Sequence, residues 1–263
     1  MISKSRLFLI VLFSTVSLTA SRVFLSTGQG KVGQESEEAA REKLKKKFPM
    51  VDSFEPESPD PQERAKRQKR GKKYNAKFPN VGDGLVQAAE GYHWPTDFKP
   101  IPVSASDVVV VGTISDARAH LSEDKNSVYS EFTVTINEVL KNNASLSLVA
   151  GDCLTLERKG GRVRYPSGHI SWFYVSGQGL PLPNAQYVLF LKTTDEERLF
   201  DILTGYEIRD GRVEPLDYSP GVVHFERYSG SDATGFLNEV RSNIANAKHS
   251  GVGRWAWDVF LVR

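Results

Sequence analysis

The sequence predicts a mainly β fold: a small antiparallel barrel or sandwich covered by a C-terminal helix and preceded by a disordered N-terminal tether. Three observations predict it. Short apolar segments recur between turn-rich segments from residue 106 to residue 216, which is typical of barrels and sandwiches. Asp210-Gly211 separates two of these segments, and Asp-Gly is a strong signal for a two-residue hairpin turn. Residues 231–248 instead repeat their apolar side chains at helical spacing.

The first expected strand, residues 106–115, contains four consecutive valines followed by Gly112. It is therefore apolar on both faces, and such a strand has something covering its outer side. The expected cover is the helix at residues 231–248, beginning at a capping Ser231 or Asp232. One stripe of that helix carries the apolar residues Phe236, Leu237, Val240 and Ile244. Gly112 fits a bend or a bulge in the strand.

Alternation and turns predict the later strands. In residues 127–140, Phe132, Val134 and Ile136 alternate with threonines, which indicates a half-buried strand. Two short strands around a Gly-Gly turn are expected in residues 151–165. The remaining strands are expected in residues 169–175, 185–192, 198–203 and 205–216.

The chain divides into four expected parts. They are a signal peptide or N-terminal anchor (1–21), a charged helix with a disordered basic linker (22–90), the β domain with its helix (91–248) and an aromatic C-terminal tail (249–263).

The amino terminus predicts export. Lys4 and Arg6 precede an uncharged run at residues 7–21, which is shorter than the roughly 20 residues of a membrane-spanning helix. This pattern is typical of a secretory signal peptide, with an uncleaved membrane anchor as the alternative. We therefore expect a secreted or extracytoplasmic protein, membrane-associated if the segment is retained.

The segment before the β domain is rich in charge and proline. Residues 35–48 have the composition of a single solvated helix, and residues 49–80 that of a disordered tether. Residues 64–78 contain eight Lys or Arg and no Asp or Glu, so the rest of the chain carries 26 basic and 32 acidic residues, a balance of −6. We expect a solvated polybasic linker. Contact with an anionic membrane surface and processing at RQKR are the alternatives, and nucleic acid is not an expected partner of an exported chain.

No catalytic or metal-binding motif is visible, so we predict no catalytic residue, metal site or cofactor. No two histidines stand at metal-ligand spacing, and no nucleophile elbow or phosphate-binding loop occurs. The histidines are His93, His120, His169, His224 and His249. Cys153 is the only cysteine, so no disulfide can form within the chain. Its alternation with Leu154 and Leu156 indicates a buried or half-buried strand position.

Two aromatic groups are candidates for binding. If residues 169–175 form a strand, Trp172 and Tyr174 share one face, which could face a ligand on a small barrel. Packing in the core or along an edge is the alternative. Trp255 and Trp257 lie in the apolar tail, which could be a final strand, a packed tail or an interfacial anchor.

Several segments between residues 105 and 245 resemble those of a known group of proteins. They are SDVVVVGTI, INEVLKN, GDCLTL, GLPLPNAQYVLFL and FLNEVR. Their succession resembles exported bacterial proteins of uncharacterised function. The β domain of those proteins is similar to the oligosaccharide/oligonucleotide-binding-type barrel of tissue inhibitors of metalloproteinases. The resemblance implies that barrel as the fold. The inhibitors act through a free amino-terminal cysteine and a set of disulfides, which this chain lacks, so the resemblance implies no inhibitory residue here.

These observations favour a non-catalytic binding module, exported or tethered to the envelope, whose partner is an unknown protein or glycan there. The alternative is a hydrolase whose site is assembled from loops of the β domain.

Overall fold

The computed structural model describes residues 48–76, 87–219 and 221–249. The chain divides into two compact units, Met1–Lys47 and Phe48–Arg263, and every described residue belongs to the second. The predicted signal peptide or anchor (1–21), the helix expected at 35–48 except for its last residue, and the tail after His249 lie outside the described residues.

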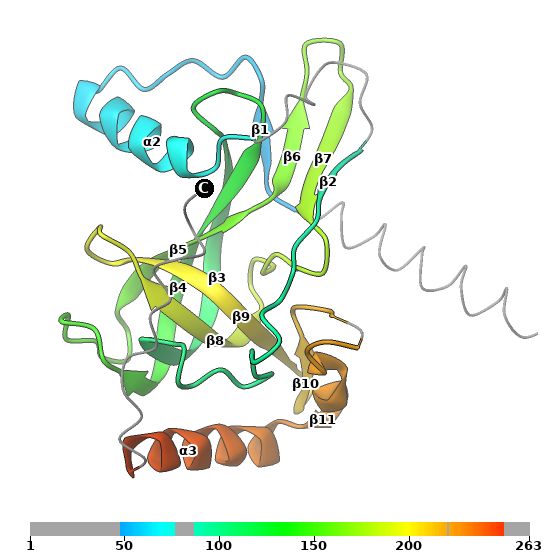
Figure 1. Cartoon of the computed structure of the whole chain (residues 1–263). Helices are drawn as coiled ribbons and strands as arrows, with labels where there is room; N and C mark the ends of the chain where they lie inside the picture. The colour runs from blue at the N-terminus through cyan, green and yellow to red at the C-terminus, as the bar shows by residue number, and fades with distance from the viewer. Residues whose placement is uncertain (1–47, 77–86, 220, 250–263) are drawn as a thin grey trace, which may run out of the picture. The chain divides into compact units, whose positions relative to one another are not determined.

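The described part is mainly β, as predicted, with two sheets and a C-terminal helix (Figure 1). The smaller sheet has the order β1-β6-β7-β2, and the larger has the order β11-β10-β9-β5-β4-β3-β8. The strands of the smaller sheet are β1 (Met50–Asp52), β2 (Gln87–Glu90), β6 (Gly161–Arg164) and β7 (Ile170–Val175). Those of the larger sheet are β3 (Val108–Leu121), β4 (Val128–Asn142), β5 (Cys153–Lys159), β8 (Gln186–Thr193), β9 (Leu199–Arg209), β10 (Arg212–Pro215) and β11 (Ser231–Asp232).

Helices α2 (Pro61–Lys73) and α3 (Ala233–His249) and the 3-10 turn η1 (Phe225–Tyr228) complete the described part. No helix within it is long and apolar enough to cross a membrane.

The four valines of β3 divide between two hydrophobic clusters. Val108 and Val110 join one cluster, formed mainly by side chains of β3, β4, β5, β8 and β9. Val109 and Val111 point to the other face and join a second cluster, to which α3 and η1 contribute. The prediction that a helix covers the outer face of this strand is therefore confirmed. Register shifts between Val109 and Val110 and between Val111 and Gly112 also confirm an irregularity or bulge there.

Strand β8 has partners on both sides. It pairs antiparallel with β3 along one edge and antiparallel with β9 along the other. β9 in turn pairs with β5, and this pair is parallel. The cluster inside these strands includes Phe132, Leu156, Leu189 and Phe200.

Helix α3 begins where the sequence predicted. The Asp232 carboxylate accepts a hydrogen bond from the backbone N–H of Gly235 at 2.7 Å, so Asp232 caps the helix. The predicted stripe of Phe236, Leu237, Val240 and Ile244 packs into the cluster beneath it.

Of the two glycine-containing turns predicted from the sequence, the structure confirms one. Asp210 and Gly211 both have positive φ, 52° and 72°, and join β9 to β10 as a hairpin, so this predicted turn is confirmed. Gly160-Gly161 does not close a hairpin, because β5 and β6 belong to different sheets. The chain crosses between the sheets there, at backbone φ values of 121° and 149° that suit glycine.

The structure differs most from the sequence prediction in residues 48–76 and 87–90. The disordered linker was predicted to cover this region, but β1 pairs with β6, β2 pairs with β7, and α2 lies between them in sequence. Val51 and Tyr74 are buried. The folded unit therefore begins at Phe48 and not near Gly91.

Candidate functional site

Three carboxylates stand side by side on the outer face of the larger sheet. Glu131 of β4 is directly opposite Glu157 of β5, which is opposite Asp201 of β9. Their strand neighbours Phe132, Leu156 and Phe200 point the other way into the core. We call Glu131, Glu157 and Asp201 the acidic row. Like charges directly opposite one another destabilise a sheet, so the row needs positive charge beside it.

Helix α2 supplies that charge. Arg70 donates to Glu131 at 2.9 Å, and also donates to Glu196 in the loop between β8 and β9 at 2.7 and 3.0 Å. Lys73 donates to Glu157 at 2.6 Å and also to Asp201. The two cations lie on one side of the helix, because positions three apart are neighbours on a helical surface.

The C-terminal end of α2 also contacts the turn between β3 and β4. A Cβ atom on Gly71 would lie 2.8 Å from the backbone nitrogen of Glu123, so this close approach depends on glycine. The Tyr74 ring stacks on Tyr129, with centroids 4.7 Å apart and planes 11° from parallel. The backbone N–H of Asp124 donates to the side-chain oxygen of Asn75 at 3.1 Å. These contacts fix the end of the helix that carries Lys73.

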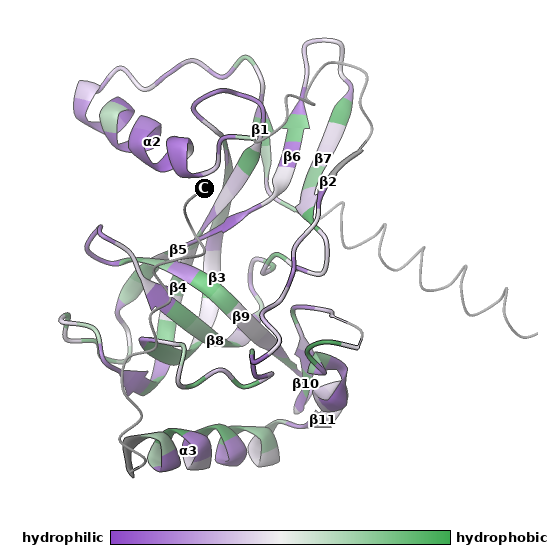
Figure 2. Cartoon of the chain, viewed as in Figure 1, coloured by the Kyte–Doolittle hydropathy of each residue, from purple (hydrophilic) through white to green (hydrophobic). Residues whose placement is uncertain are grey.

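Helix α2 has almost no apolar side chain of its own. It contains seven Lys or Arg, and Ala65 is the only hydrophobic residue after Pro61. Figure 2 colours it hydrophilic over nearly its whole length. A helix without an apolar stripe cannot be held by burial. Apart from the contacts at Gly71 and Tyr74, α2 is held to the sheet by charge.

Charges and burial shift the pKa values in the site. Burial disfavours the ionised form of Glu131, but its neighbours His120 and Arg70 outweigh burial and lower its pKa to about 2. Burial also disfavours the charged form of Lys73, but Asp201 and Glu157 outweigh it and raise the Lys73 pKa above its usual value. For Glu157, burial outweighs the attraction of Lys73 and raises the pKa. The row thus combines a carboxylate that stays ionised in acid with one that binds a proton more readily.

Two histidines face carboxylates. His120 Nε2 lies 3.5 Å from Glu131 Oε2, and His224 Nδ1 lies 3.0 Å from Glu226 Oε1. In the described ranges, no hydrogen bond joins either imidazole to a serine, threonine or cysteine side chain. No group of three or more His, Cys, Asp or Glu side chains there could hold a metal ion.

Cys153 is exposed, so the prediction of a buried or half-buried cysteine was wrong. It is the first residue of β5 and lies on the outer face, while Leu154 and Leu156 occupy the inner face. Its Sγ is 3.8 Å from Thr135 Oγ1. Alternation correctly predicted the strand but not which side of it was covered.

The predicted aromatic pair lies on β7, away from the acidic row. Trp172 and Tyr174 share one half-buried face, while Phe173 and Val175 point to the buried side. Trp172 is opposite Arg162 of β6 on one side and Gln87 of β2 on the other. The shared face is as predicted, and a ligand on it stays a prediction. The acidic row belongs to the other sheet, so the structure does not bring the two together.

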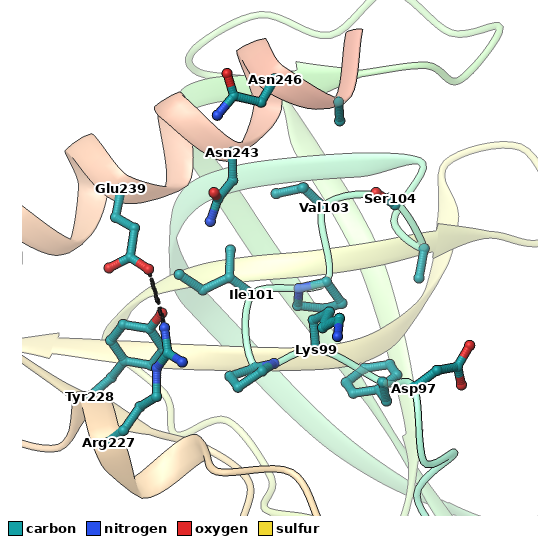
Figure 3. Close-up of a pocket in the computed structure, with 15 residues that line it drawn as sticks. Asp97, Lys99, Ile101, Val103, Ser104, Arg227, Tyr228, Glu239, Asn243 and Asn246 are labelled. Atoms are coloured by element: carbon teal, nitrogen blue, oxygen red, sulfur yellow. Dashed lines mark hydrogen bonds and ion pairs between the residues drawn. The ribbon is translucent and has the colours of Figure 1, made fainter. Parts of the chain in front are cut away.

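A groove of about 760 Å³ lies between residues 97–105, η1 and α3. Its volume is within the roughly 300–1,000 Å³ of typical ligand pockets. In Figure 3, Asn243 extends from α3 toward the loop that carries Ile101, whereas Glu239 extends toward Arg227 and Tyr228 of η1. The Tyr228 hydroxyl donates to Glu239 at 2.6 Å, and burial raises the pKa of Tyr228 to about 12. This groove lies against α3, whereas the acidic row lies against α2.

Comparison with known proteins finds no protein-family model that matches the chain and no matching curated protein. The chain's own residues are therefore the basis for inferring its function.

Sequence reasoning missed the acidic row and its helix. The three acids come from separate strands, and only the register of β4, β5 and β9 brings them together. Helix α2 did have a local signal. Asp60 accepts a hydrogen bond from the Gln62 backbone N–H at 2.9 Å, Pro61 is the first helical residue, and Glu63 lies in the first turn. An N-cap aspartate followed by proline and an early glutamate is a helix start.

Proposed function

We propose that this chain is a non-catalytic binding module, exported or tethered to the cell envelope, that recognises a basic helical segment of a partner protein through the acidic row. One observation carries the proposal: three adjacent carboxylates on separate strands face a helix that has strong positive charge and almost no apolar surface. Helix α2 is then the ligand of this surface within the same chain.

The strand pairings support a closed barrel as the scaffold. β3, β4, β5, β9 and β8 each pair with the next, and β8 pairs back to β3. We propose that these five strands form a barrel of the oligosaccharide/oligonucleotide-binding type, like that of tissue inhibitors of metalloproteinases. Such barrels bind ligands on the second and third strands and on the loops after the first and fourth strands. The corresponding elements here are β4, β5 and the two loops that contact α2.

The sign of the charge selects the class of partner. A row of carboxylates repels phosphate-bearing ligands and attracts Lys and Arg. Helix α2 is also less available to an anionic membrane than a free polybasic linker would be. Lys69, Arg70 and Lys73 pair with carboxylates of the β domain, so membrane contact through these residues would require their ion pairs to break.

A peptide-binding experiment tests the recognition surface. The probe is a fluorescent peptide of residues 58–76. The full chain with Arg70→Ala and Lys73→Ala, which frees the acidic row, is expected to bind it at least tenfold more tightly than the parent chain, in which α2 competes. Binding should weaken as salt rises from about 0.01 M to about 1 M, because the Debye length falls from about 30 Å to about 3 Å.

Two further variants control this experiment. Lys66→Ala with Lys72→Ala removes the same charge from exposed positions of α2 that make no ion pair with the described β strands, and it should behave as the parent. Adding Glu157→Gln and Asp201→Asn to the Arg70/Lys73 variant should abolish binding. If the Arg70/Lys73 variant keeps its circular dichroism spectrum and does not bind the peptide, the acidic row is not a recognition surface.

The export part of the proposal rests on the charged start and the uncharged run at residues 7–21. Mass analysis of the amino terminus after cell fractionation tests it. A chain cleaved near residue 21 outside the cytoplasm supports a signal peptide, and an intact chain in the membrane fraction supports the anchor. An intact chain in the soluble cytoplasm would contradict export.

A further inference from the structure

The groove between residues 97–105 and α3 combines apolar side chains and two amides with four charged residues, Asp97, Lys99, Arg227 and Glu239. Ile101 and Val103 of the loop line it, and Asn243 and Asn246 line it from α3. Neither asparagine side chain has a hydrogen-bond partner among the described residues. A carboxamide donates and accepts at once, which matches the N–H and C=O groups of an extended peptide. Apolar walls next to such amides suit an extended segment with large apolar side chains.

The end of this chain has that composition and starts beside the groove. Helix α3 ends at His249, two residues after Ala247, which lines the groove. The sequence continues SGVGRWAWDVFLVR to residue 263. In an extended segment, alternate side chains share a face, so Trp255, Trp257, Val259 and Leu261 would form one entirely apolar face.

The length of the remaining chain allows a return along α3. From Asn246 back to Glu239 the helix axis covers only about 10 Å at 1.5 Å per residue. The residues after His249 can span up to about 46 Å when extended. Gly251 and Gly253 suit the reversal, because glycine adopts the positive φ values of tight turns.

We propose that the groove is the docking site of the chain's own C-terminal segment, residues 251–263. The segment runs back along α3 in an extended conformation. Its tryptophans pack against the apolar wall of the loop, and its backbone is hydrogen-bonded by Asn243 and Asn246. The proposal is independent of the acidic row, because it concerns another face of the fold.

Hydrogen exchange of the full chain, followed by mass spectrometry of peptides from residues 250–263, tests the proposal. The parent is expected to exchange these amides at least tenfold more slowly than an unstructured peptide of the same sequence. Asn243→Trp fills the groove and should remove the protection. Ser242→Trp places the same ring on an exposed position of α3 and should leave the protection intact.

Three outcomes would overturn the proposal. One is exchange of the segment in the parent at the rate of the free peptide. Another is equal protection in the parent and in Asn243→Trp when both keep the same thermal midpoint. The last is protection that appears only at high protein concentration or only with added lipid vesicles, which would assign the segment to a second copy or to a membrane.

Discussion

Two side chains, Arg70 and Lys73, neutralise most of the acidic row. Glu157 is the most sensitive member, because its side chain is 2% exposed and lies between Glu131 and Asp201. The Glu157 carboxylate accepts from Lys73 through one oxygen, and the neighbouring Tyr74 also lowers its pKa. Its ionisation therefore depends on Lys73.

Replacing Lys73 by alanine is expected to lower the free energy of unfolding by about 1–3 kcal/mol. Removing one partner of a buried ion pair costs about 3–5 kcal/mol, and the 34% exposure of the Lys73 side chain reduces that cost. Chemical denaturation of the full chain measures it. Adding Glu157→Gln should recover part of the loss, because the uncompensated charge is removed.

Lys72→Ala is the matched control. Lys72 is exposed on the same helix, so its removal should change stability by less than about 0.5 kcal/mol. An equal loss from Lys72→Ala and Lys73→Ala would mean that the contact of Lys73 with the acidic row does not account for the effect, because alanine is the better helix former of the two residue types.

At the level of elements, the sequence predicts the strands and helices whose apolar residues recur at a regular spacing. The strands and α3 bury one or both faces, so the spacing of their apolar residues indicates which faces are buried. Asp210-Gly211 is predictable from its two residue types alone, because they favour the positive φ values of the turn. The short strands β1 and β2 have only three and four residues, too few for a periodic signal. Helix α2 has no regularly spaced apolar residues, because it packs on a charged surface formed by residues far along the chain.

Removing residues 1–90 is expected to lower the thermal midpoint by roughly 10–20 °C relative to a chain that starts at Phe48. The deletion takes away β1 and β2, which pair with β6 and β7, together with the buried side chains of Val51 and Tyr74. Each large buried side chain is worth about 1.5–3 kcal/mol, and 1 kcal/mol shifts a domain of this size by about 2–4 °C.

This expectation differs from the one drawn from the sequence, in which residues 49–80 have the composition of a disordered tether. Calorimetry of the two chains distinguishes them. Midpoints within about 3 °C of each other would show that β1, α2 and β2 are dispensable to the fold.

For the molecule as a whole, the acidic row couples stability to pH. The folded-state pKa of Glu131 is about 2, below its ordinary value of 4.5. A lowered carboxylate pKa stabilises the fold above the unfolded value, and this contribution is lost as the pH falls toward the folded value. Glu157 has a raised pKa and acts in the opposite sense, so its ionisation costs stability as the pH rises above its unfolded value.

We expect the stability of the parent to fall between about pH 4.5 and pH 2, by up to about 3 kcal/mol from Glu131 alone. Denaturation curves across this range measure it. Glu131→Gln should be less stable than the parent at neutral pH, and its curve should be flatter below pH 4.5. The same slope in both proteins would contradict the assigned role of Glu131.

The pairing of β3 with β8 constrains the time at which the protein can fold. Val108 pairs with Leu191, and Thr155 of β5 pairs with Leu199 of β9. Contacts between residues so far apart form slowly, because a long loop must close before they form. During synthesis, the central strands cannot all pair until the ribosome has made β9. A chain made only as far as β8 therefore cannot complete the larger sheet, because β9 supplies the partner that both β5 and β8 require.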